Sequence, residues 1–156
     1  MGEILTLEDA VRRRAAARVL AQTFVFTNGC FDILHPGHIA LLRHAGDLGH
    51  YLMVGINSDR SAHALDKGSG RPAQDERARA TVLSALAAVN GVVVFDEETP
   101  LRLIEALRPD VLVKGGDYTP DQVVGKDVVE REGGRVVIVP LVPGYSSSKI
   151  VALKRG

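Results

Sequence analysis

Residues 23–42 read TFVFTNGCFDILHPGHIALL, and this stretch decides the fold. It opens with an apolar, β-branched run over Thr23–Asn28, and the segment Gly37–Leu48 then carries apolar residues at helical spacing. Near-continuous apolar character is typical of a strand buried on both faces of a parallel sheet. A buried strand that leads directly into a helix predicts the first half of a βαβ unit.

The rest of the chain repeats this alternation. Further apolar runs predict strands over Tyr51–Asn57, Val92–Phe95, Asp110–Lys114 and Arg135–Pro140. Helical spacing and capping signals predict helices over Gln74–Val89, from Thr99-Pro100 to Arg108-Pro109, from Thr119-Pro120 to Gly133-Gly134, and from about Ser146. We therefore expect an α/β fold, a Rossmann-like open parallel β-sheet with helices on both faces.

A further helix is predicted over Thr6–Leu20, ahead of this pattern. Leu7, Val11 and Ala15 fall four apart, which indicates an apolar face. We expect residues 1–156 to form a single domain in which 1–22 are a helical extension outside the α/β pattern. The apolar face of that helix suggests a homodimer as a hypothesis. The arginines at 12–14 point in different directions on a helix and are predicted to be solvated.

Composition narrows the class of protein. The 156 residues carry 19 Lys and Arg against 19 Asp and Glu, a net charge of zero. This balance argues against general nucleic-acid or membrane-surface binding, which favours a basic excess. One cysteine excludes an intramolecular disulfide framework and a Cys-rich metal site. The absence of a long apolar segment and of a secretory signal predicts a cytoplasmic protein.

The predicted chemistry begins where the first strand of residues 23–42 ends. His35 and His38 lie on the first turn of the predicted helix, with Pro36 and Gly37 between them. Free backbone N–H groups at a helix N-terminus attract phosphate, and two histidines three apart can donate to the same group. As imidazolium they would also offset charge in a transition state. A turn with two solvated histidines and a zinc pair are the alternatives; no third metal ligand is evident.

These residues resemble a known family. The run NGCFDILHPGH resembles the signature of the cytidylyltransferase-like nucleotidyltransferases, and VGINSD, DKGSGRP, DERA, LVKGGDY and PGYSSSKI resemble its sugar-phosphate branch. The resemblance covers about residues 23–152. Within the branch, the chain is most similar to heptose 1-phosphate adenylyltransferases, and the stand-alone form is implied because no kinase half is present. Three serines replace the more familiar Ser-Thr-Thr, and Gly115-Gly116 before Asp117 favours a sugar phosphate and ATP over glycerol phosphate.

The resemblance implies that a sugar 1-phosphate attacks the α-phosphorus of ATP, with Mg²⁺ as the cofactor. The catalytic residues would be His35, His38 and Lys67. ATP would contact the two histidines together with Asn28, Gly29, Phe31, Lys114, Gly116, Asp117, Ser146, Ser147 and Ser148. The sugar phosphate would contact Asp32, Asn57, Asp59, Arg71 and Arg77.

Several of these residues have a plainer reading. Asp32 could orient a histidine or cap a turn, and Asp59 could cap the following helix. Arg79 points away from Arg77 by helical phase and is predicted to be solvated. A cytidylyltransferase acting on glycerol 3-phosphate and a non-catalytic nucleotide-binding sensor remain alternative functions.

Overall fold

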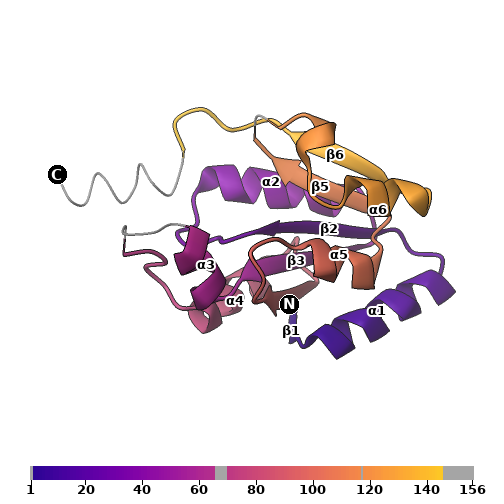
Figure 1. Ribbon diagram of the computed structural model, residues 1–156, viewed down its shortest axis with the longest axis horizontal. Coiled ribbons are helices and arrows are strands. Elements are labelled where there is room, and N and C mark those ends of the chain that lie inside the picture. Colours follow the sequence, from indigo (N-terminus) through magenta and orange to yellow (C-terminus); the bar gives the residue numbers. More distant parts are fainter. Residues whose placement is uncertain (1, 66–69, 117, 146–156) are drawn as a thin grey trace.

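The structure is a computed structural model that describes residues 2–65, 70–116 and 118–145. Its centre is a six-stranded parallel sheet in the order β1-β4-β3-β2-β5-β6. Figure 1 shows the strands side by side through the middle of the molecule, with helices on both sides. The Rossmann-like open parallel sheet predicted from the sequence is confirmed.

The strands lie close to the predicted runs. They are β1 Glu3–Leu5, β2 Phe24–Gly29, β3 Tyr51–Asn57, β4 Gly91–Phe95, β5 Val111–Gly115 and β6 Arg135–Val139. Burial is almost complete along β2 and β3, as expected for central strands covered on both faces.

The helices are shorter than the sequence suggests. They are α1 Leu7–Val19, α2 Pro36–Asp47, α3 Asp59–Leu65, α4 Glu76–Ser84, α5 Leu101–Leu107, the 3₁₀ turn η1 Pro120–Gln122, and α6 Lys126–Arg131. The helix predicted from Thr119-Pro120 divides into η1 and α6. The division falls at Gly125, whose φ of 91° is incompatible with a continuous α-helix.

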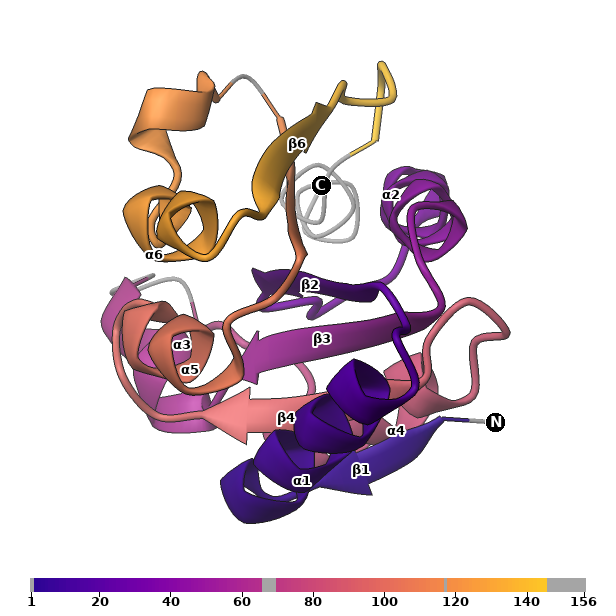
Figure 2. The same ribbon diagram turned by 90° about the vertical axis from the view of Figure 1, so that its right-hand side faces the viewer.

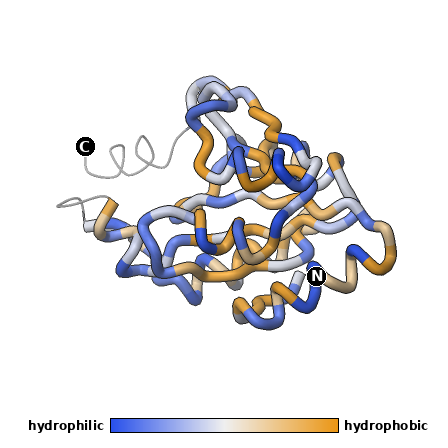
Figure 3. The backbone as a smooth tube through the Cα atoms, turned by 45° about the vertical axis from the view of Figure 1, so that its right-hand side comes forward, coloured by the Kyte–Doolittle hydropathy of each residue, from blue (hydrophilic) through white to orange (hydrophobic). Residues whose placement is uncertain are grey.

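Two apolar layers hold the helices to the sheet. On one face, Leu42 and Ala45 of α2 and Leu83 of α4 pack over β2 and β3. On the other face, Ile104 and Leu107 of α5 belong to a second cluster, which also contains buried residues of α1 and α6. Figure 2 shows α2 and α4 on one side of the sheet and α5 and α6 on the other. Figure 3 shows hydrophobic stretches along the chain path through these layers.

The N-terminal segment differs from its prediction. Residues 3–5 form a strand that pairs with β4, with Ile4 opposite Val92, and α1 packs on α5 and β4. We predicted that residues 1–22 lie outside the α/β pattern. That prediction is wrong, because β1 is a strand of the sheet and α1 packs on it. A strand of three residues is too short to show a period of two, which explains why the sequence pattern missed it.

The buried face of α1 also differs from the prediction. Leu7 and Val11 are 41% and 39% exposed, whereas Ala10, Arg14 and Ala17 are buried. Arg14 was predicted to be solvated, and that prediction is wrong. Its guanidinium donates to the carbonyl oxygens of residues 107 and 108 and to the carboxylate of residue 110. Hydrogen bonds to every side of the group offset the cost of burying its charge.

The order of the strands places the expected ligand site. From β2 the chain builds outward through β3 to β4, then crosses back to place β5 on the other side of β2. Thr27 of β2 lies between Val54 of β3 and Val113 of β5. In open α/β sheets, ligands bind at the carboxyl ends of the strands where the winding reverses. Here that position lies between β2 and β5. None of the described helices has the length and apolarity to cross a membrane.

Candidate active site

A cavity of about 290 Å³ opens at the carboxyl ends of β2 and β5. The turn after β2, the first turn of α2, the end of β5 and the segment after β6 all contribute to it. Its lining residues are Asn28, Gly29, Cys30, Phe31, His35, Gly37, His38, Leu41, Lys114, Gly115, Val139, Pro140, Leu141, Val142 and Tyr145. The tertiary structure thus brings together Asn28, Gly29, Phe31, both histidines and Lys114 of the predicted ATP-binding set.

His35 is held at the start of α2 by its own backbone neighbours. It is the N-cap residue, with extended backbone angles, and its Nδ1 accepts the Gly37 N–H at 3.1 Å. A Cβ at residue 37 would lie 2.9 Å from His35 Cε1, so glycine is required for this contact. Because Nδ1 is an acceptor, the proton of the neutral ring lies on Nε2, which can donate to a ligand.

His38 lies beneath His35. The two rings stack with centroids 3.8 Å apart and an angle of 23° between their planes, and the Phe31 ring lies 5.2 Å from His38. Burial, helped by the neighbouring His35, lowers the pKa of His38 to about 4, against a smaller raising effect of the Ile33 backbone. Burial also lowers the pKa of His35. At neutral pH His38 is therefore a neutral hydrogen-bond donor, and not the imidazolium that the sequence analysis considered.

Phe31 contributes through its backbone as well as its ring. Its φ of 49° lies in the left-handed region, which is uncommon for a large side chain. The conformation turns the chain sharply after β2 and places the ring, 5% exposed, against His38. The strained turn lies at the floor of the cavity, a location where strained residues tend to gather.

Lys114 brings a cation to the same place from β5. Its Nζ lies 5.6 Å from the centroid of the Tyr118 ring, and burial lowers its pKa. Within the described residues, Lys114 forms no ion pair. The cost of burying its charge is thus not offset by a carboxylate partner in that part of the chain.

A second cavity, of about 320 Å³, adjoins the first. It lies toward the ends of β3 and β4 and the start of α5. The lining residues are Asn28, Gly29, Cys30, Asn57, Leu65, Glu98, Thr99, Pro100, Lys114, Tyr118, Gln122, Val123 and Val124. Four residues line both cavities: Asn28, Gly29, Cys30 and Lys114. The carboxyl ends of β2 and β5 therefore form the boundary between two adjacent spaces.

Asp32 fixes the polypeptide segment that faces the turn after β2. Its carboxylate is buried and accepts from Arg71 Nε at 3.0 Å and from the N–H groups of Ala73 and Gln74 at 2.8 and 2.9 Å. No described contact joins it to either histidine. The geometry favours the anchoring of residues 71–74 over the orientation of a histidine. Arg71 is half-buried and already shares its charge with Asp32.

Arg79 is the largest correction to the sequence analysis. It was predicted to be solvated, but it is 1% exposed. Its guanidinium donates to the carbonyl oxygens of Cys30, Asn57 and Gln74 and to the carboxylate of Asp59 at 2.8 Å. It therefore joins the ends of β2 and β3 to the segment before α4. Helical phase could not show this, because the sheet approaches α4 from a direction that the helix sequence does not encode.

The remaining predicted site residues are distributed as follows. Asn57 lines the second cavity, while Asp59 is paired with Arg79 beside it. Arg77 is exposed on α4 and lines neither cavity. Gly116 adopts a φ of 120° in the turn after β5. Lys67, Asp117, Ser146, Ser147 and Ser148 lie outside the described residues.

Sequence reasoning missed several residues of the two cavities, among them Tyr145, Glu98 and Thr99. Tyr145 lies in the first, with its ring 6.3 Å from that of His35. Glu98 and Thr99 lie in the second, just after β4. Thr99 was noticed only as a helix start. The available signal was its position after a buried strand, where the carboxyl ends of the sheet gather ligand-binding residues.

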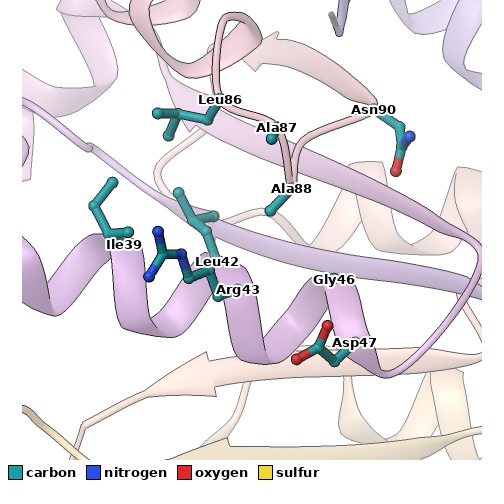
Figure 4. A pocket seen from close by; sticks show the side chains of 9 residues that line it. All are labelled: Ile39, Leu42, Arg43, Gly46, Asp47, Leu86, Ala87, Ala88 and Asn90. Carbon is teal, nitrogen blue, oxygen red and sulfur yellow. The ribbon is translucent and has the colours of Figure 1, made fainter.

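Two other cavities of the described structure lie apart from the histidine pair. One, of about 380 Å³, lies at the amino end of the sheet and is lined by charged residues, among them Arg14, Arg18, Arg108, Asp110 and Glu132. The other, of about 510 Å³, lies between α2 and residues 86–90, where Ile39, Leu42 and Leu86 point into one space (Figure 4). It opens near the amino end of β4, away from the histidines. Among the described residues, no group of three or more His, Cys, Asp or Glu could hold a metal ion.

Comparison with known proteins identifies the family. Residues 26–153 match the cytidylyltransferase-like family, so the chain belongs to that family. It is 52% identical over 154 residues to the bifunctional protein HldE of Azorhizobium caulinodans, covering 99% of this chain and 32% of that protein. It is 60% identical over 127 residues to the HldE of Hyphomonas neptunium, covering 81% of this chain and 26% of that protein. The chain thus spans about a third or less of these relatives.

Solved structures agree with the fold. A lipopolysaccharide core biosynthesis protein from Thermoplasma volcanium superposes with a TM-score of 0.64 at 29% identity, over 78% of this chain and 97% of that one. A pantoate-beta-alanine ligase from Francisella tularensis superposes with a TM-score of 0.66 at 14% identity, over 99% of this chain and 77% of that one. At that identity, the second likeness concerns the fold alone.

Proposed function

We propose that this chain is a nucleotidyltransferase that transfers AMP from ATP to a heptose 1-phosphate, giving ADP-heptose and pyrophosphate. The observation that carries the proposal is the stacked pair His35 and His38 at the start of α2, inside the cavity between β2 and β5. Membership of the cytidylyltransferase-like family supports the reaction class. The HldE relatives, and the lipopolysaccharide core biosynthesis protein of similar fold, support a heptose as the acceptor.

In this reaction the side chains bind and orient the substrates and stabilise charge. An oxygen of the sugar phosphate attacks the α-phosphorus of ATP, and the bond to the bridging oxygen breaks as pyrophosphate leaves. The attacking oxygen is already an anion, so no general base is needed. Such a reaction depends on in-line placement and on donors aimed at the developing charge.

The histidines fit that requirement as neutral donors. His35 is free to donate through Nε2, because Nδ1 accepts from Gly37. The low pKa of His38 keeps its ring neutral at pH 7. The N-terminus of α2, a helix of 12 residues, adds the positive end of its dipole at the same point. The triphosphate would therefore lie across the first turn of α2.

Two adjacent cavities fit a reaction with two substrates. In this proposal, ATP occupies the cavity between β2 and β5, and the sugar phosphate occupies the one lined by Asn57 and Glu98. Lys67 would close over the phosphates. Asp117 would accept from ribose hydroxyls, and Ser146, Ser147 and Ser148 would donate to the β- and γ-phosphates. These last assignments rest on the family resemblance.

Mg²⁺ belongs to this proposal as part of the Mg–ATP substrate. Magnesium prefers oxygen ligands and is often bound through phosphates and waters with few protein carboxylates. The described lining of the two cavities contains one carboxylate, that of Glu98. This donor set fits an ion carried by the triphosphate. A cytoplasmic location, where ATP is abundant, belongs to the same proposal.

A direct assay tests the proposal. Purified protein is incubated with Mg²⁺ and either ATP or CTP, and with either heptose 1-phosphate or glycerol 3-phosphate, while pyrophosphate release is measured. We expect release only with ATP and heptose 1-phosphate. Release with CTP and glycerol 3-phosphate would replace the proposed substrate pair. ATP binding without release from any pair would favour a nucleotide-binding sensor.

The homodimer remains a prediction. Leu7 and Val11 stay exposed on the outer face of α1, so an apolar surface is available. Deleting residues 1–20 is not a clean test, because it would also remove β1 from the sheet. A Leu7→Ser, Val11→Ser variant changes exposed side chains and leaves the core in place, and light scattering measures its mass. An unchanged mass relative to a dimeric parent would exclude this face from the contact.

A further inference from the structure

Lys114 is the one cationic side chain among the four described residues that border both cavities. The first cavity also contains the titratable side chains of His35, His38 and Tyr145. The second contains those of Glu98 and Tyr118, and Cys30 lines both cavities. Among the described lining residues, Lys114 is the one cationic lysine or arginine in either cavity, and it lines both.

The position of Lys114 is fixed by the sheet. It lies at the carboxyl end of β5, opposite Ile138 of β6 in the register, one residue beyond the pairing of Val113 with Thr27 of β2. Packing near the Tyr118 ring restricts the side chain further. A lysine held this way lies at the boundary between the two spaces.

The charge of Lys114 has no protein carboxylate beside it in the described part of the chain. The neighbouring cations Arg71 and Arg79 differ in this respect, because Arg71 pairs with Asp32 and Arg79 with Asp59. A half-buried ammonium group that faces two cavities, with no carboxylate partner among the described residues, is available to an anion whose charge grows during the reaction.

We infer that Lys114 Nζ binds a non-bridging oxygen of the α-phosphate, the group that is transferred from one substrate to the other. This inference rests on the proposed function, and it assigns a catalytic residue to it. In a reaction between neighbouring substrates, the transferred phosphorus lies at the boundary of their sites. A cation there stabilises the charge that gathers on the equatorial oxygens as the bond to pyrophosphate breaks.

Replacement of Lys114 separates this role from simple ATP binding. For Lys114→Met we expect kcat to fall by about 100-fold, the scale of losing one oriented charge-stabilising group. The dissociation constant of α,β-methylene-ATP, measured by calorimetry, should change by about three-fold or less. Lys114→Arg should recover part of kcat. The matched control is Lys126→Met, since Lys126 pairs with Asp121 and Glu130 on α6, outside both cavities.

A sulfur substitution locates the contact. Sulfur at a non-bridging α-position accepts hydrogen bonds poorly, so the wild-type enzyme should be slower with one diastereomer of the α-phosphorothioate of ATP. In Lys114→Met that difference should shrink, because the contact is already missing. An undiminished difference would place Lys114 elsewhere and overturn the inference.

The outcomes separate this inference from the proposed function. If wild-type protein turns over ATP and heptose 1-phosphate but Lys114→Met retains full kcat, the inference fails and the function stands. A variant with weakened analogue binding and unchanged kcat also contradicts it, because Lys114 would then bind the ground state alone. If wild-type protein releases no pyrophosphate from any substrate pair, both fail.

Discussion

The two ends of the parallel sheet each contain a buried arginine, yet they differ in the polar groups that lie beside it. At the amino end, Arg14 is surrounded by carbonyl oxygens and Asp110, which in turn accepts the Phe24 N–H. At the carboxyl end, Arg79 is equally enclosed. Beside it, however, the His35–His38 pair and Lys114 face open cavities.

This difference separates architecture from function. A buried charge that is saturated by protein groups holds elements together and has nothing left for a ligand. A buried polar group that faces a cavity with unused bonding capacity is available for chemistry. By this criterion Arg14 at the amino end is structural. At the carboxyl end, Arg79 joins the ends of two strands, and the histidine pair and Lys114 nearby face cavities.

The largest expected effect compares the two arginines. Arg14→Met and Arg79→Met should each lower the free energy of unfolding by roughly 3–5 kcal/mol, because each leaves buried partners without a donor. Of the two, Arg79→Met alone should also lower the turnover of the remaining folded protein. Urea unfolding measures the stability, and assays at saturating substrate measure the turnover.

Arg77→Met, on the exposed face of α4, is the stability control and should change the free energy of unfolding by about 0.5 kcal/mol or less. Equal turnover in the Arg14 and Arg79 variants would remove the distinction between the ends.

His38→Ala tests the reactive half of the carboxyl end. We expect kcat to fall by about 10²–10³-fold, the loss expected for one oriented donor. The dissociation constant for ATP should change little, because the donor acts mainly on charge that develops in the transition state. Pyrophosphate release and calorimetry supply the two measurements. His44→Ala, an exposed histidine on the same helix, serves as the control. Unchanged turnover in His38→Ala would contradict the role assigned to this ring.

The pH dependence of stability follows from the lowered pKa of His38. The folded state holds the ring neutral down to about pH 4, whereas the unfolded chain protonates near its ordinary value of 6.5. The stability linked to this group is therefore complete above pH 6.5 and is lost as the pH falls toward 4. Allowing for solvent screening, we expect a loss on the order of 1–2 kcal/mol. Urea midpoints at pH 7 and pH 4.5 should differ more for wild type than for His38→Gln, with His44→Gln behaving as wild type.

The same lowered pKa predicts how activity varies with pH. A neutral donor in the free enzyme gives a kcat/KM without a titration of His38 between about pH 6.5 and 8, since His38 does not titrate there. If the imidazolium were the active form, kcat/KM would rise as the pH falls through this range. A pH profile of kcat/KM distinguishes the two forms of the ring.

The smallest expected effect lies at the surface of the amino end. Arg108 forms an ion pair with Glu132 at 3.4 Å, with both side chains about half exposed. Arg108→Gln should change the free energy of unfolding by about 0–1 kcal/mol, because exposed pairs contribute little. Its backbone carbonyl, which accepts from Arg14, remains in place. A loss as large as that of Arg14→Met would show that exposure does not decide the contribution of arginines at this end.

Much of the site could be predicted from the sequence because it follows strands. Asn28 and Lys114 lie at the carboxyl ends of buried apolar strands, and His35 and His38 lie at the start of the helix that follows the first of them. Parallel strands bring their carboxyl ends to one edge of the sheet. The cavity-lining segments around Tyr145 and Glu98 follow the same rule but lack a residue type that singles them out. Strand β1 was missed because three residues carry too little pattern.

The burial of single arginines could not be predicted. Periodicity reports which face of a helix is apolar on average, whereas Arg79 is buried because the ends of β2 and β3 offer carbonyl oxygens to it. The same holds for Arg14, whose partners are about 95 residues away along the chain. Long-range carbonyl partners leave no mark in the local sequence.

The sequence by itself determined the parallel α/β sheet, the position of the site at the carboxyl end of β2, and the identity of its histidines. Each of these depends on local chemistry, namely apolar runs, helix caps and residue types at fixed spacing. The tertiary structure alone decided which charges are consumed by the protein and which remain available to a ligand. That distinction depends on groups far apart in the chain, and folding sets the distances between them.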